Sequence, residues 1–300
     1  VGSITAETWE YYKELGYNMS DLVGIDGCEA EFEEYLRGKD GVLTIKRNAK
    51  GEIVEEKITV EPIAGKDVWL TIDIETQIAT EDALKQYMKD FNKNEGASVA
   101  MDPNTGDILA IASYPTYDLT SFNKDYNSLA ANEHLPLLNR ACYAVYAPGS
   151  TFKVVTAICA IENIPDLYSR KFKCTGKKTF GKGDVICNGV HGTLDFERAL
   201  NVSCNSVFSE LANEVGKDKL TETVRTLGFG KNVTISKAKT VRSTFDVSDS
   251  TKLDLGWAGI GQYTTLVNPG QMLMFMGAIA NGGRAMTPYI VEESSEIKIT

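Results

Sequence analysis

Ser150 and Lys153 are the residues whose types and spacing most clearly suit chemistry in this sequence. They lie three positions apart, at the start of a nearly uninterrupted apolar stretch over residues 154–161. Such a stretch predicts a buried helix, with both side chains on one face and one turn apart. Burial disfavours the charged form of a lysine, and a neutral amine can take the proton of a serine hydroxyl. The pair therefore predicts an activated serine nucleophile.

The surroundings of Ser150 distinguish it from the other serines that have a lysine three positions later. Pro148-Gly149 precedes Ser150 and allows the chain to turn sharply into the apolar helix. In the first helical turn, free backbone N–H groups and the helix dipole favour an oxyanion. The alternative is a helix-capping serine beside a surface lysine. The pattern Ser-x-x-Lys occurs at Ser121, Ser150, Ser236 and Ser295.

A second polar motif, Ser203-Cys204-Asn205, lies between two expected helices. A hydroxyl and an amide on such a loop could bridge the catalytic lysine and a substrate amide, and could relay a proton to a leaving group. The alternative is that Ser203 or Asn205 caps the following helix. The position of this motif after the Ser150 motif favours the catalytic interpretation.

Three cysteines and one histidine fall within 31 residues, at Cys174, Cys187, His191 and Cys204. Three thiolates and an imidazole are a sufficient ligand set for structural zinc, although a close Cys-x2-Cys pair is absent from the sequence. Two alternatives stay open: a disulfide between Cys174 and Cys187, or unlinked thiols. A zinc ion here would tie a glycine- and lysine-rich excursion, residues 175–186, to the Ser203 motif.

The elements that must position these residues are strands followed by a run of helices. After a strand at 67–73, helical spacing over 74–93 precedes two strands, 97–102 and 107–113, around a Pro/Asn/Gly turn. Residues 114–138 look irregular. This order predicts the α+β fold class, with an antiparallel sheet packed with helices. The expected helices are 150–161, 196–202, 206–215, 218–227 and 269–280.

A separate domain is expected before this part of the chain. Residues 5–15 and 29–36 resemble short helices, and residues 41–47 and 52–60 alternate like two strands of a hairpin. Residues 61–65 resemble a linker. The expected domains are therefore 1–64 and 65–300.

Composition excludes some classes of protein. Hydrophobic residues make up 43% of the 300 residues, which is enough for a substantial core, and the net charge of -10 argues against a nucleic-acid surface. No stretch approaches the roughly 20 apolar residues that span a bilayer, and no signal peptide opens the chain. Because the sequence starts at Val1 without a methionine, we expect upstream sequence to have been removed.

Taken together, the motifs resemble those of class B penicillin-binding proteins, whose transpeptidase domain has a serine β-lactamase-like fold. Pro148–Lys153 and Ser203–Asn205 are similar to the first two of three family motifs. His191-Gly192 beside Ser203–Asn205 favours the elongation branch. Further similar segments cover most of the chain: Gly24–Gly38 with their pedestal, or dimerisation, domain, Leu70–Asp73 and Ala100–Ala110 with the start of the transpeptidase domain, and Gly259–Gln262 and Ala280–Gly283 with later signatures.

The third family motif, Lys-Thr-Gly, is absent from the sequence. Lys178-Thr179-Phe180 and Lys239-Thr240-Val241 lack the glycine that lets substrate lie against the strand. In the family this motif follows the segment similar to Ala280–Gly283. We therefore expect that residues 65–300 are a transpeptidase domain truncated before its Lys-Thr-Gly strand, and that 1–64 are part of the pedestal domain.

The resemblance implies a D,D-transpeptidase that cross-links peptidoglycan stem peptides ending in D-Ala-D-Ala and that β-lactams acylate. Ser150 would be the nucleophile, Lys153 its base, and Ser203 or Lys153 the proton donor to the leaving group. Asn205 would orient the acyl amide, and the Ser150 N–H would form half of the oxyanion hole. The chemistry itself would need no cofactor.

The resemblance also implies a membrane-anchored parent protein with an extracytoplasmic catalytic domain. Its partners would be a glycosyltransferase and proteins of cell elongation or division, with no nucleic acid. Two alternatives stay open. One is a β-lactam-sensing or β-lactam-hydrolysing relative, against which the pedestal-like residues 1–60 argue. The other is a non-catalytic scaffold with the same fold, which only the absent third motif supports.

Overall fold

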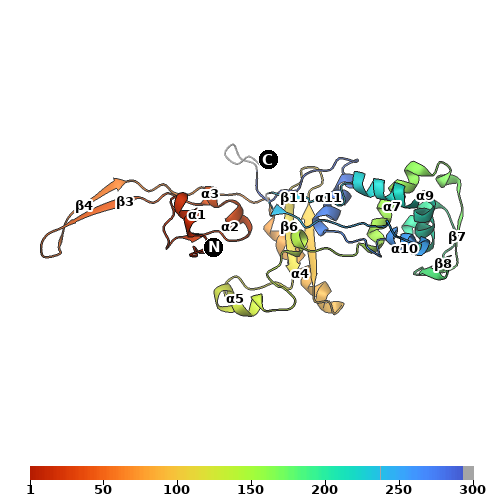
Figure 1. The fold of residues 1–300 in the computed structure, drawn as a ribbon, viewed down its shortest axis with the longest axis horizontal. Helices are drawn as coiled ribbons and strands as arrows, with labels where there is room; N and C mark the ends of the chain where they lie inside the picture. The colour runs from red at the N-terminus through yellow and green to blue at the C-terminus, as the bar shows by residue number, and fades with distance from the viewer. Residues whose placement is uncertain (237, 293–300) are drawn as a thin grey trace. The chain divides into compact units, whose positions relative to one another are not determined.

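The computed structural model describes residues 1–236 and 238–292, which form two compact units (Figure 1). One unit contains residues 1–71 with 291–292, and the other contains residues 72–290. The domain boundary between residues 64 and 65 stays a prediction. The last residues of the expected second domain, 293–300, lie outside the described part of the chain, as does the Ser-x-x-Lys pattern at Ser295.

The first unit has a small aromatic and aliphatic core. Ile4, Tyr17 and Val23 are buried, with Trp9 and Tyr12 packed against them. The helix expected at 5–15 is present in shorter form, and the one expected at 29–36 is divided into two short helices that begin two residues earlier. The elements of this part are β1 (Gly2–Ser3), α1 (Trp9–Glu14), β2 (Leu22–Val23), α2 (Gly27–Glu31) and α3 (Glu33–Leu36).

A hairpin of β3 (Val42–Arg47) and β4 (Ile53–Val60) completes the first unit and confirms both expected strands to within one residue. The Asn48 side chain shapes its turn, because its carbonyl oxygen accepts hydrogen bonds from the N–H groups of Lys50 and Glu52. Every residue of both strands is exposed.

The second unit begins with a helix packed on an antiparallel hairpin. Strands β5 (Gly96–Met101) and β6 (Ile108–Tyr114) pair as expected, and α4 (Ile74–Asp90) packs on both. The expected strand at 67–73 is wrong. Leu70 makes only one isolated bridge, and Asp73 instead caps α4 by accepting a hydrogen bond from the Thr76 N–H at 2.8 Å.

Helices are the main elements in the rest of the described chain, as expected. A central helix, α7, packs against α9, and the two expected helices at 206–215 and 218–227 are the halves of α9, separated at Gly216 by its positive φ of 80°. The region expected to be irregular, 114–138, contains one helix, α5. The helical elements are α5 (Phe122–Ala130), α6 (Arg140–Tyr143), η1 (Gly149–Phe152), α7 (Lys153–Asn163), η2 (Leu167–Ser169), α8 (Phe196–Asn201), α9 (Asn205–Thr226), α10 (Lys252–Ala258) and α11 (Pro269–Ala280).

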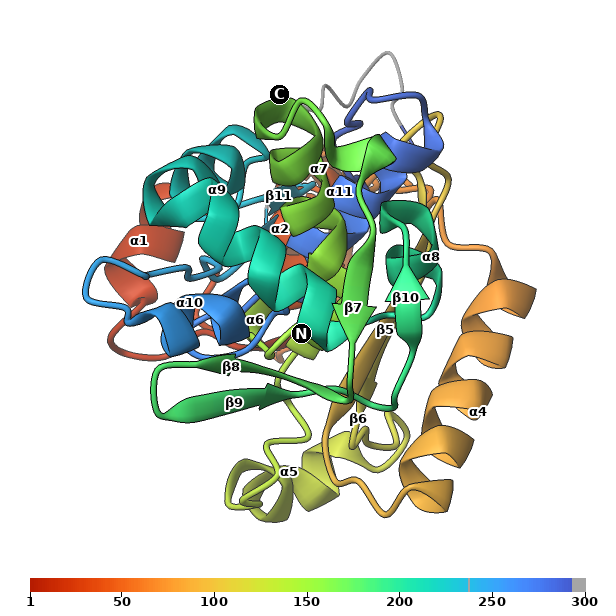
Figure 2. The ribbon, with the colours of Figure 1, turned by 90° about the vertical axis from the view of Figure 1, so that its right-hand side faces the viewer.

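Short strands that the sequence pattern did not predict lie between α7 and α8 (Figure 2). Strand β7 (Phe172–Cys174) pairs with β10 (Gly192–Leu194), and β8 (Lys177–Phe180) pairs with β9 (Gly183–Ile186). Residues 175–186, which were expected to form an excursion, therefore contain the hairpin of β8 and β9. The β7–β10 pair joins the chain before this hairpin to the chain after it. A further short pair consists of β11 (Thr234–Ile235) and β12 (Ala238–Lys239).

The core of the second unit lies between α7, α9 and the strands β7, β9 and β10. Ala157 and Ala160 of α7 are small, so the buried Phe208 and Leu211 of α9 can approach closely. Within the described residues, no helix is both long enough and apolar enough to cross a membrane.

Candidate active site and thiol cluster

The turn that carries Ser150 depends on two glycines. Gly149 has a φ of +56°, and its N–H donates to the carbonyl oxygen of Gly261 at 2.9 Å. A Cβ atom on Gly261 would lie 2.2 Å from the Gly149 oxygen, so only glycine fits there. Ser150 is exposed in η1, while Phe152 of the same turn is fully buried. The turn thus presents the hydroxyl and anchors its other side in the core.

Lys153, at the start of α7, is buried, with 1% of its surface exposed. Its Nζ lies 3.2 Å from Ser150 Oγ, 2.8 Å from Ser203 Oγ, 2.6 Å from the Ser203 carbonyl oxygen and 2.6 Å from Asn205 Oδ1. Removal from water lowers the pKa of Lys153 to about 8, although the nearby Cys187 and Cys204 act in the opposite direction. A usable fraction of the amine is therefore neutral near neutral pH.

The loop Ser203–Asn205 reaches Lys153 because its backbone leaves α8 in an unusual conformation. Ser203 has a φ of +54°, in the left-handed region that few residues other than glycine adopt. Asn205 is the first residue of α9, and its Nδ2 donates to the Ile186 carbonyl oxygen at 2.8 Å. The amide of Asn205 therefore connects the end of β9 to Lys153.

Hydrogen-bond roles around Lys153 constrain the direction of proton transfer. The Ser203 carbonyl and Asn205 Oδ1 can only accept, so each takes a proton of Nζ. A neutral amine has two such protons and one lone pair. With both protons engaged, the lone pair is left for a hydroxyl, either that of Ser150 or that of Ser203. The arrangement can deprotonate Ser150 and then exchange a proton with Ser203.

The structure brings Ser150, Lys153, Ser203 and Asn205 together, whereas the other described Ser-x-x-Lys serines have structural contacts. The Ser121 hydroxyl donates to Asp125 Oδ2 at 2.6 Å, within α5 and its preceding turn. Ser236 is buried, and its hydroxyl accepts a hydrogen bond from the Ile290 N–H at 2.9 Å. Neither serine has the lysine network of Ser150.

The four residues of the expected zinc site also converge. The candidate ligand atoms of Cys174, Cys187, His191 and Cys204 all lie within 4.8 Å of one another. His191 Nδ1 is 3.5 Å from the sulfurs of Cys174 and Cys187, and the sulfurs of Cys187 and Cys204 are 3.8 Å apart. The pairing of Cys174 with Gly192 across β7 and β10 brings His191 to this point.

The thiols of this cluster are free, so the alternative disulfide between Cys174 and Cys187 is not formed in the structure. Burial raises the pKa of the Cys204 thiol to about 12. Burial also acts to raise the pKa of Cys174, but hydrogen bonds from Ser206 and His191 outweigh it and lower that pKa to about 6. Cys174 therefore forms a thiolate readily, whereas the thiolate of Cys204 forms only with strong stabilisation.

Some residues of the site were not identified from their chemistry in the sequence. The Gly259 carbonyl accepts a hydrogen bond from Thr156 of α7 at 2.6 Å, and Gly261 holds the Ser150 turn. The glycines were noted only as a segment similar to the family. Ile186, whose carbonyl orients Asn205, carries no sequence signal, because a backbone group can belong to any residue type.

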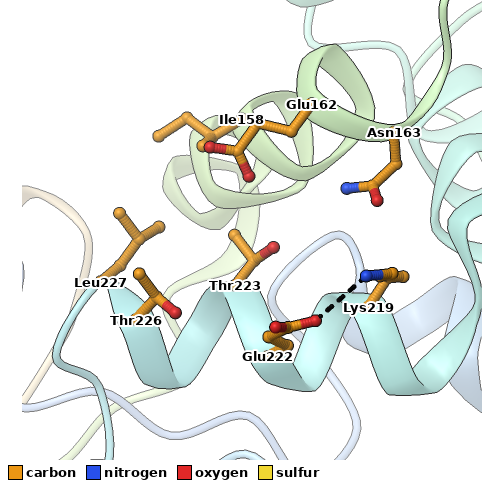
Figure 3. A pocket seen from close by; sticks show the side chains of 8 residues that line it. All are labelled: Ile158, Glu162, Asn163, Lys219, Glu222, Thr223, Thr226 and Leu227. Atoms are coloured by element: carbon orange, nitrogen blue, oxygen red, sulfur yellow. Dashed lines mark hydrogen bonds and ion pairs between the residues drawn. The ribbon is translucent and has the colours of Figure 1, made fainter.

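A pocket of about 190 Å³ lies elsewhere on α7, between its second half and the second half of α9 (Figure 3). Glu162 and Asn163 face Lys219, Glu222 and Thr223 across it, and Lys219 pairs with Glu222 at 3.2 Å. None of the four candidate catalytic residues lines this pocket, so it is separate from the Ser150 site. Its remaining lining residues are Ile158, Thr226 and Leu227.

Comparison with protein families gives two matches that together cover most of the chain. Residues 96–299 match the family model of the penicillin binding protein transpeptidase domain. Residues 1–70 match that of the penicillin-binding protein dimerisation domain. The first match contains all four candidate catalytic residues and the thiol cluster.

Curated proteins from several bacteria are similar to the chain. It is 28% identical to peptidoglycan D,D-transpeptidase MrdA of Acinetobacter baumannii, over 94% of the chain and 44% of that protein. It is 31% identical to penicillin-binding protein 3 of Bacillus subtilis, over 99% of the chain and 44% of that protein. The chain thus spans less than half the length of these relatives.

Solved structures give the same result. The chain matches a structure described as a peptidoglycan synthase complex that coordinates polymerization and crosslinking, with a TM-score of 0.87, 29% identity, and coverage of 97% of the chain and 54% of that protein. It matches the complex between PBP2 and MreC from Helicobacter pylori with a TM-score of 0.80 and 25% identity, over 98% of the chain and 56% of that protein. These matches agree with the expected fold class.

Proposed function

Because this chain belongs to the penicillin-binding protein transpeptidase family, as a class B member of the elongation type, we propose that its complete protein is a peptidoglycan D,D-transpeptidase. The observation that carries the proposal is the buried Lys153, whose Nζ contacts Ser150, Ser203 and Asn205 together. The sequence contains no Lys-Thr-Gly and spans less than half of its relatives, so activity, substrate and partners are proposed for the complete natural protein.

The first half-reaction is acylation of Ser150. Lys153 takes the hydroxyl proton, and Ser150 Oγ forms a bond to the carbonyl carbon of the penultimate D-Ala of a stem peptide. The Ser150 N–H, at the start of the helix, stabilises the oxyanion of the tetrahedral intermediate. The intermediate collapses by breaking the peptide bond, and the terminal D-Ala amine leaves with the proton, delivered by Lys153 directly or through Ser203.

The second half-reaction transfers the acyl group to a neighbouring stem peptide. The side-chain amine of that peptide attacks the serine ester and loses a proton to Lys153, and the proton returns to Ser150 Oγ as the ester bond breaks. Asn205 orients the acyl amide, because its Oδ1 is held by Lys153 and its Nδ2 by the Ile186 carbonyl. No cofactor takes part in either half-reaction.

β-Lactams are proposed to acylate Ser150 by the same attack. A related solved structure, penicillin-binding protein A of Mycobacterium tuberculosis, is described as an imipenem acyl-enzyme complex, and it matches 76% of the chain with a TM-score of 0.68. The ring-opened drug remains tethered to the serine and keeps the acceptor amine out.

We also propose that Cys174, Cys187, His191 and Cys204 hold a structural zinc ion. In a tetrahedral site with Zn–S bonds of about 2.3 Å, sulfurs lie about 3.8 Å apart and sulfur–nitrogen pairs about 3.5 Å apart. Three of the six separations, 3.8 Å between Cys187 and Cys204 and 3.5 Å from His191 to two sulfurs, fit this geometry, and all four ligand atoms lie within 4.8 Å of one another. Zinc would immobilise the loop that presents Ser203 and Asn205 and would take no part in acyl transfer.

The proposed partners are a glycosyltransferase and proteins of cell elongation. The matched structures support this assignment, since one contains a penicillin-binding protein with MreC and the other is a synthase that combines polymerization and crosslinking. The complete protein is proposed to be anchored in the membrane, with residues 1–300 outside the cytoplasm.

A cross-linking assay tests the proposed activity. The complete protein is incubated with peptidoglycan strands that carry pentapeptide stems, and mass spectrometry follows free D-Ala and cross-linked dimers. Equal release of D-Ala and formation of dimers, both lost in Ser150→Ala, is the expected result. Steady hydrolysis of penicillin without dimers would favour a β-lactam-hydrolysing relative, and no reaction with either substrate would favour a non-catalytic scaffold.

A further inference from the structure

Asn268 is a fully buried polar residue outside the catalytic network, with 0% of its surface exposed. It is the N-cap of α11, and its Oδ1 accepts hydrogen bonds from the N–H groups of Gly270 and Gln271. Its Nδ2 uses both protons elsewhere, donating to the carbonyl oxygens of Cys142 at 3.0 Å and Ala144 at 2.9 Å. One side chain therefore joins the start of α11 to the last turn of α6 and to the residue that follows it.

The segment that follows α6 is the one that leads to Ser150. Tyr146 exchanges two backbone hydrogen bonds with Val267, at 3.0 Å and 2.8 Å, and the Gly149 N–H donates to Gly261 at 2.9 Å. Residues 144–149 thus run beside residues 261–268. The backbone pairing stops at the end of this contact that is farther from Ser150. There the Asn268 side chain holds the two segments together.

The backbone of Asn268 is held by a third stretch of chain, residues 241–243. The Asn268 N–H donates to the hydroxyl of Ser243, which is buried with 2% of its surface exposed. Val241 N–H donates to the Cys142 carbonyl at 2.9 Å, next to one of the bonds from Asn268. Asn268 therefore lies where three stretches of chain meet, each too irregular to hold its neighbours by regular sheet pairing.

Ser150 and Lys153 are held by different parts of the fold. Lys153 Nζ is fixed by Ser203 and Asn205, at the start of α9. The approach to Ser150 is fixed by the contacts of residues 144–149 with 261–268. The separation of 3.2 Å between Nζ and Oγ thus depends on both sets of contacts, and a small shift of either changes it.

We propose that Asn268 is a positioning residue for Ser150, which sets the distance between the nucleophile and Lys153 by tying residues 142–144 to α11. The inference rests on the proposed acylation of Ser150. Asn268 acts through the backbone, since among the described residues its side-chain partners are all backbone groups.

The test is Asn268→Ser in the complete protein. Serine keeps a side-chain oxygen that can cap α11 but lacks both Nδ2 donors. The acylation rate constant and the dissociation constant of the preceding non-covalent complex are measured separately with a slow chromogenic β-lactam, by stopped flow. We expect the rate constant to fall about 100-fold, as for a displacement of the nucleophile by about 1 Å, with the dissociation constant changed less than about threefold.

The matched control is Asn281→Ser. Asn281 lies at the other end of α11, where its Nδ2 donates to the Arg284 carbonyl. Its variant should acylate like the wild type. A similar loss in both variants would show a general weakening of α11 and overturn the positioning role, as would an unchanged rate constant in Asn268→Ser.

Asn268→Thr decides the question if Asn268→Ser does not fold. Like serine, threonine keeps a side-chain oxygen that can cap α11 and lacks both Nδ2 donors to Cys142 and Ala144, and its methyl group fills part of the space that the amide leaves. A lower acylation rate constant with an unchanged dissociation constant supports the positioning role, and an unchanged rate constant overturns it. Wild-type protein that forms no serine ester would contradict the proposed function itself, and this inference with it.

Discussion

At the scale of single residues, the account depends on the state of Lys153. Its pKa is lowered to about 8, mainly by removal from water, and two acceptor-only oxygens hold it at 2.6 Å. These contacts favour the ammonium form and desolvation opposes it. Both the charged and the neutral form of Lys153 are therefore populated near physiological pH. A general base is most effective when its pKa lies in that range.

Acylation by a β-lactam should therefore depend on pH with a midpoint near 8. The neutral amine is the reactive form, so the rate should rise about tenfold per pH unit below the midpoint and become constant above it. Stopped-flow measurements between pH 6 and pH 9.5 on the complete protein check this, with Lys153→Met as a slow control. A rate independent of pH, or one that falls as pH rises, would exclude Lys153 as the base.

Cys204 should be essential for metal content. Burial raises the pKa of its thiol to about 12, so a bound zinc ion has to displace a tightly held proton and binding should weaken at low pH. We expect about one zinc ion per protein by elemental analysis, and near none in Cys204→Ser. Cys28→Ser, in the first unit, is the matched control and should retain zinc. Purified wild-type protein without zinc after zinc-supplemented growth would contradict the proposed site.

At the scale of elements, the site depends on a contact between two turns. The turn of Gly149–Phe152 packs on Gly261, with so little space that a methyl group at Gly261 would meet three atoms at 2.2 to 2.8 Å. Those atoms belong to Gly149 and Phe152, on either side of Ser150. Packing between turns therefore controls the position of the nucleophile.

Gly261→Ala should be far more damaging than Gly230→Ala. Both glycines have positive φ, +76° and +86°, but a Cβ atom on Gly230 would meet nothing within 4 Å. Gly230→Ala should lower the free energy of unfolding by about 1 kcal/mol, from backbone strain alone. Gly261→Ala should lower it by about 3 kcal/mol and also slow acylation, because its clash moves the Ser150 turn. Urea denaturation and β-lactam acylation measure both effects, and equal losses in the two variants would contradict this packing argument.

Local patterns in the sequence predicted the elements of regular periodicity and the residues on them. The apolar run after Lys153 indicated the buried helix, and the Pro/Asn/Gly turn indicated the hairpin of β5 and β6. Strands β7 to β10 were missed, because strands of three or four residues are too short to show a period of two. The expected strand at 67–73 failed because its single bridge, at Leu70, gives it no continuous partner.

The site was predictable in its residues but not in its contacts. The spacing of Ser150 and Lys153 indicated one turn of helix, and the thiol cluster followed from residue types. The contacts of Lys153 with Ser203 and Asn205 join positions 50 and 52 residues apart, which depends on how α7 packs against α9. Contacts with backbone groups, such as the Ile186 carbonyl, cannot be predicted from residue types, because every residue has a carbonyl.

At the scale of the whole molecule, the chain consists of two compact units that match two different family models. Residues 1–70 match the dimerisation domain and residues 96–299 match the transpeptidase domain of penicillin-binding proteins. The net charge of -10 argues against a nucleic-acid substrate and agrees with the proposed peptide substrates. The proposed activity needs a second oxyanion-hole donor besides the Ser150 N–H.

The most direct test of the central claim is the intact mass of the complete protein after exposure to penicillin, with Ser150→Ala treated in parallel. We predict one stable adduct, with the mass of one intact β-lactam, on the wild type and no adduct on the variant. Peptide mapping should place the adduct on Ser150. Folded wild-type protein without an adduct, or an adduct that persists in Ser150→Ala, would contradict the assignment of Ser150 as the nucleophile.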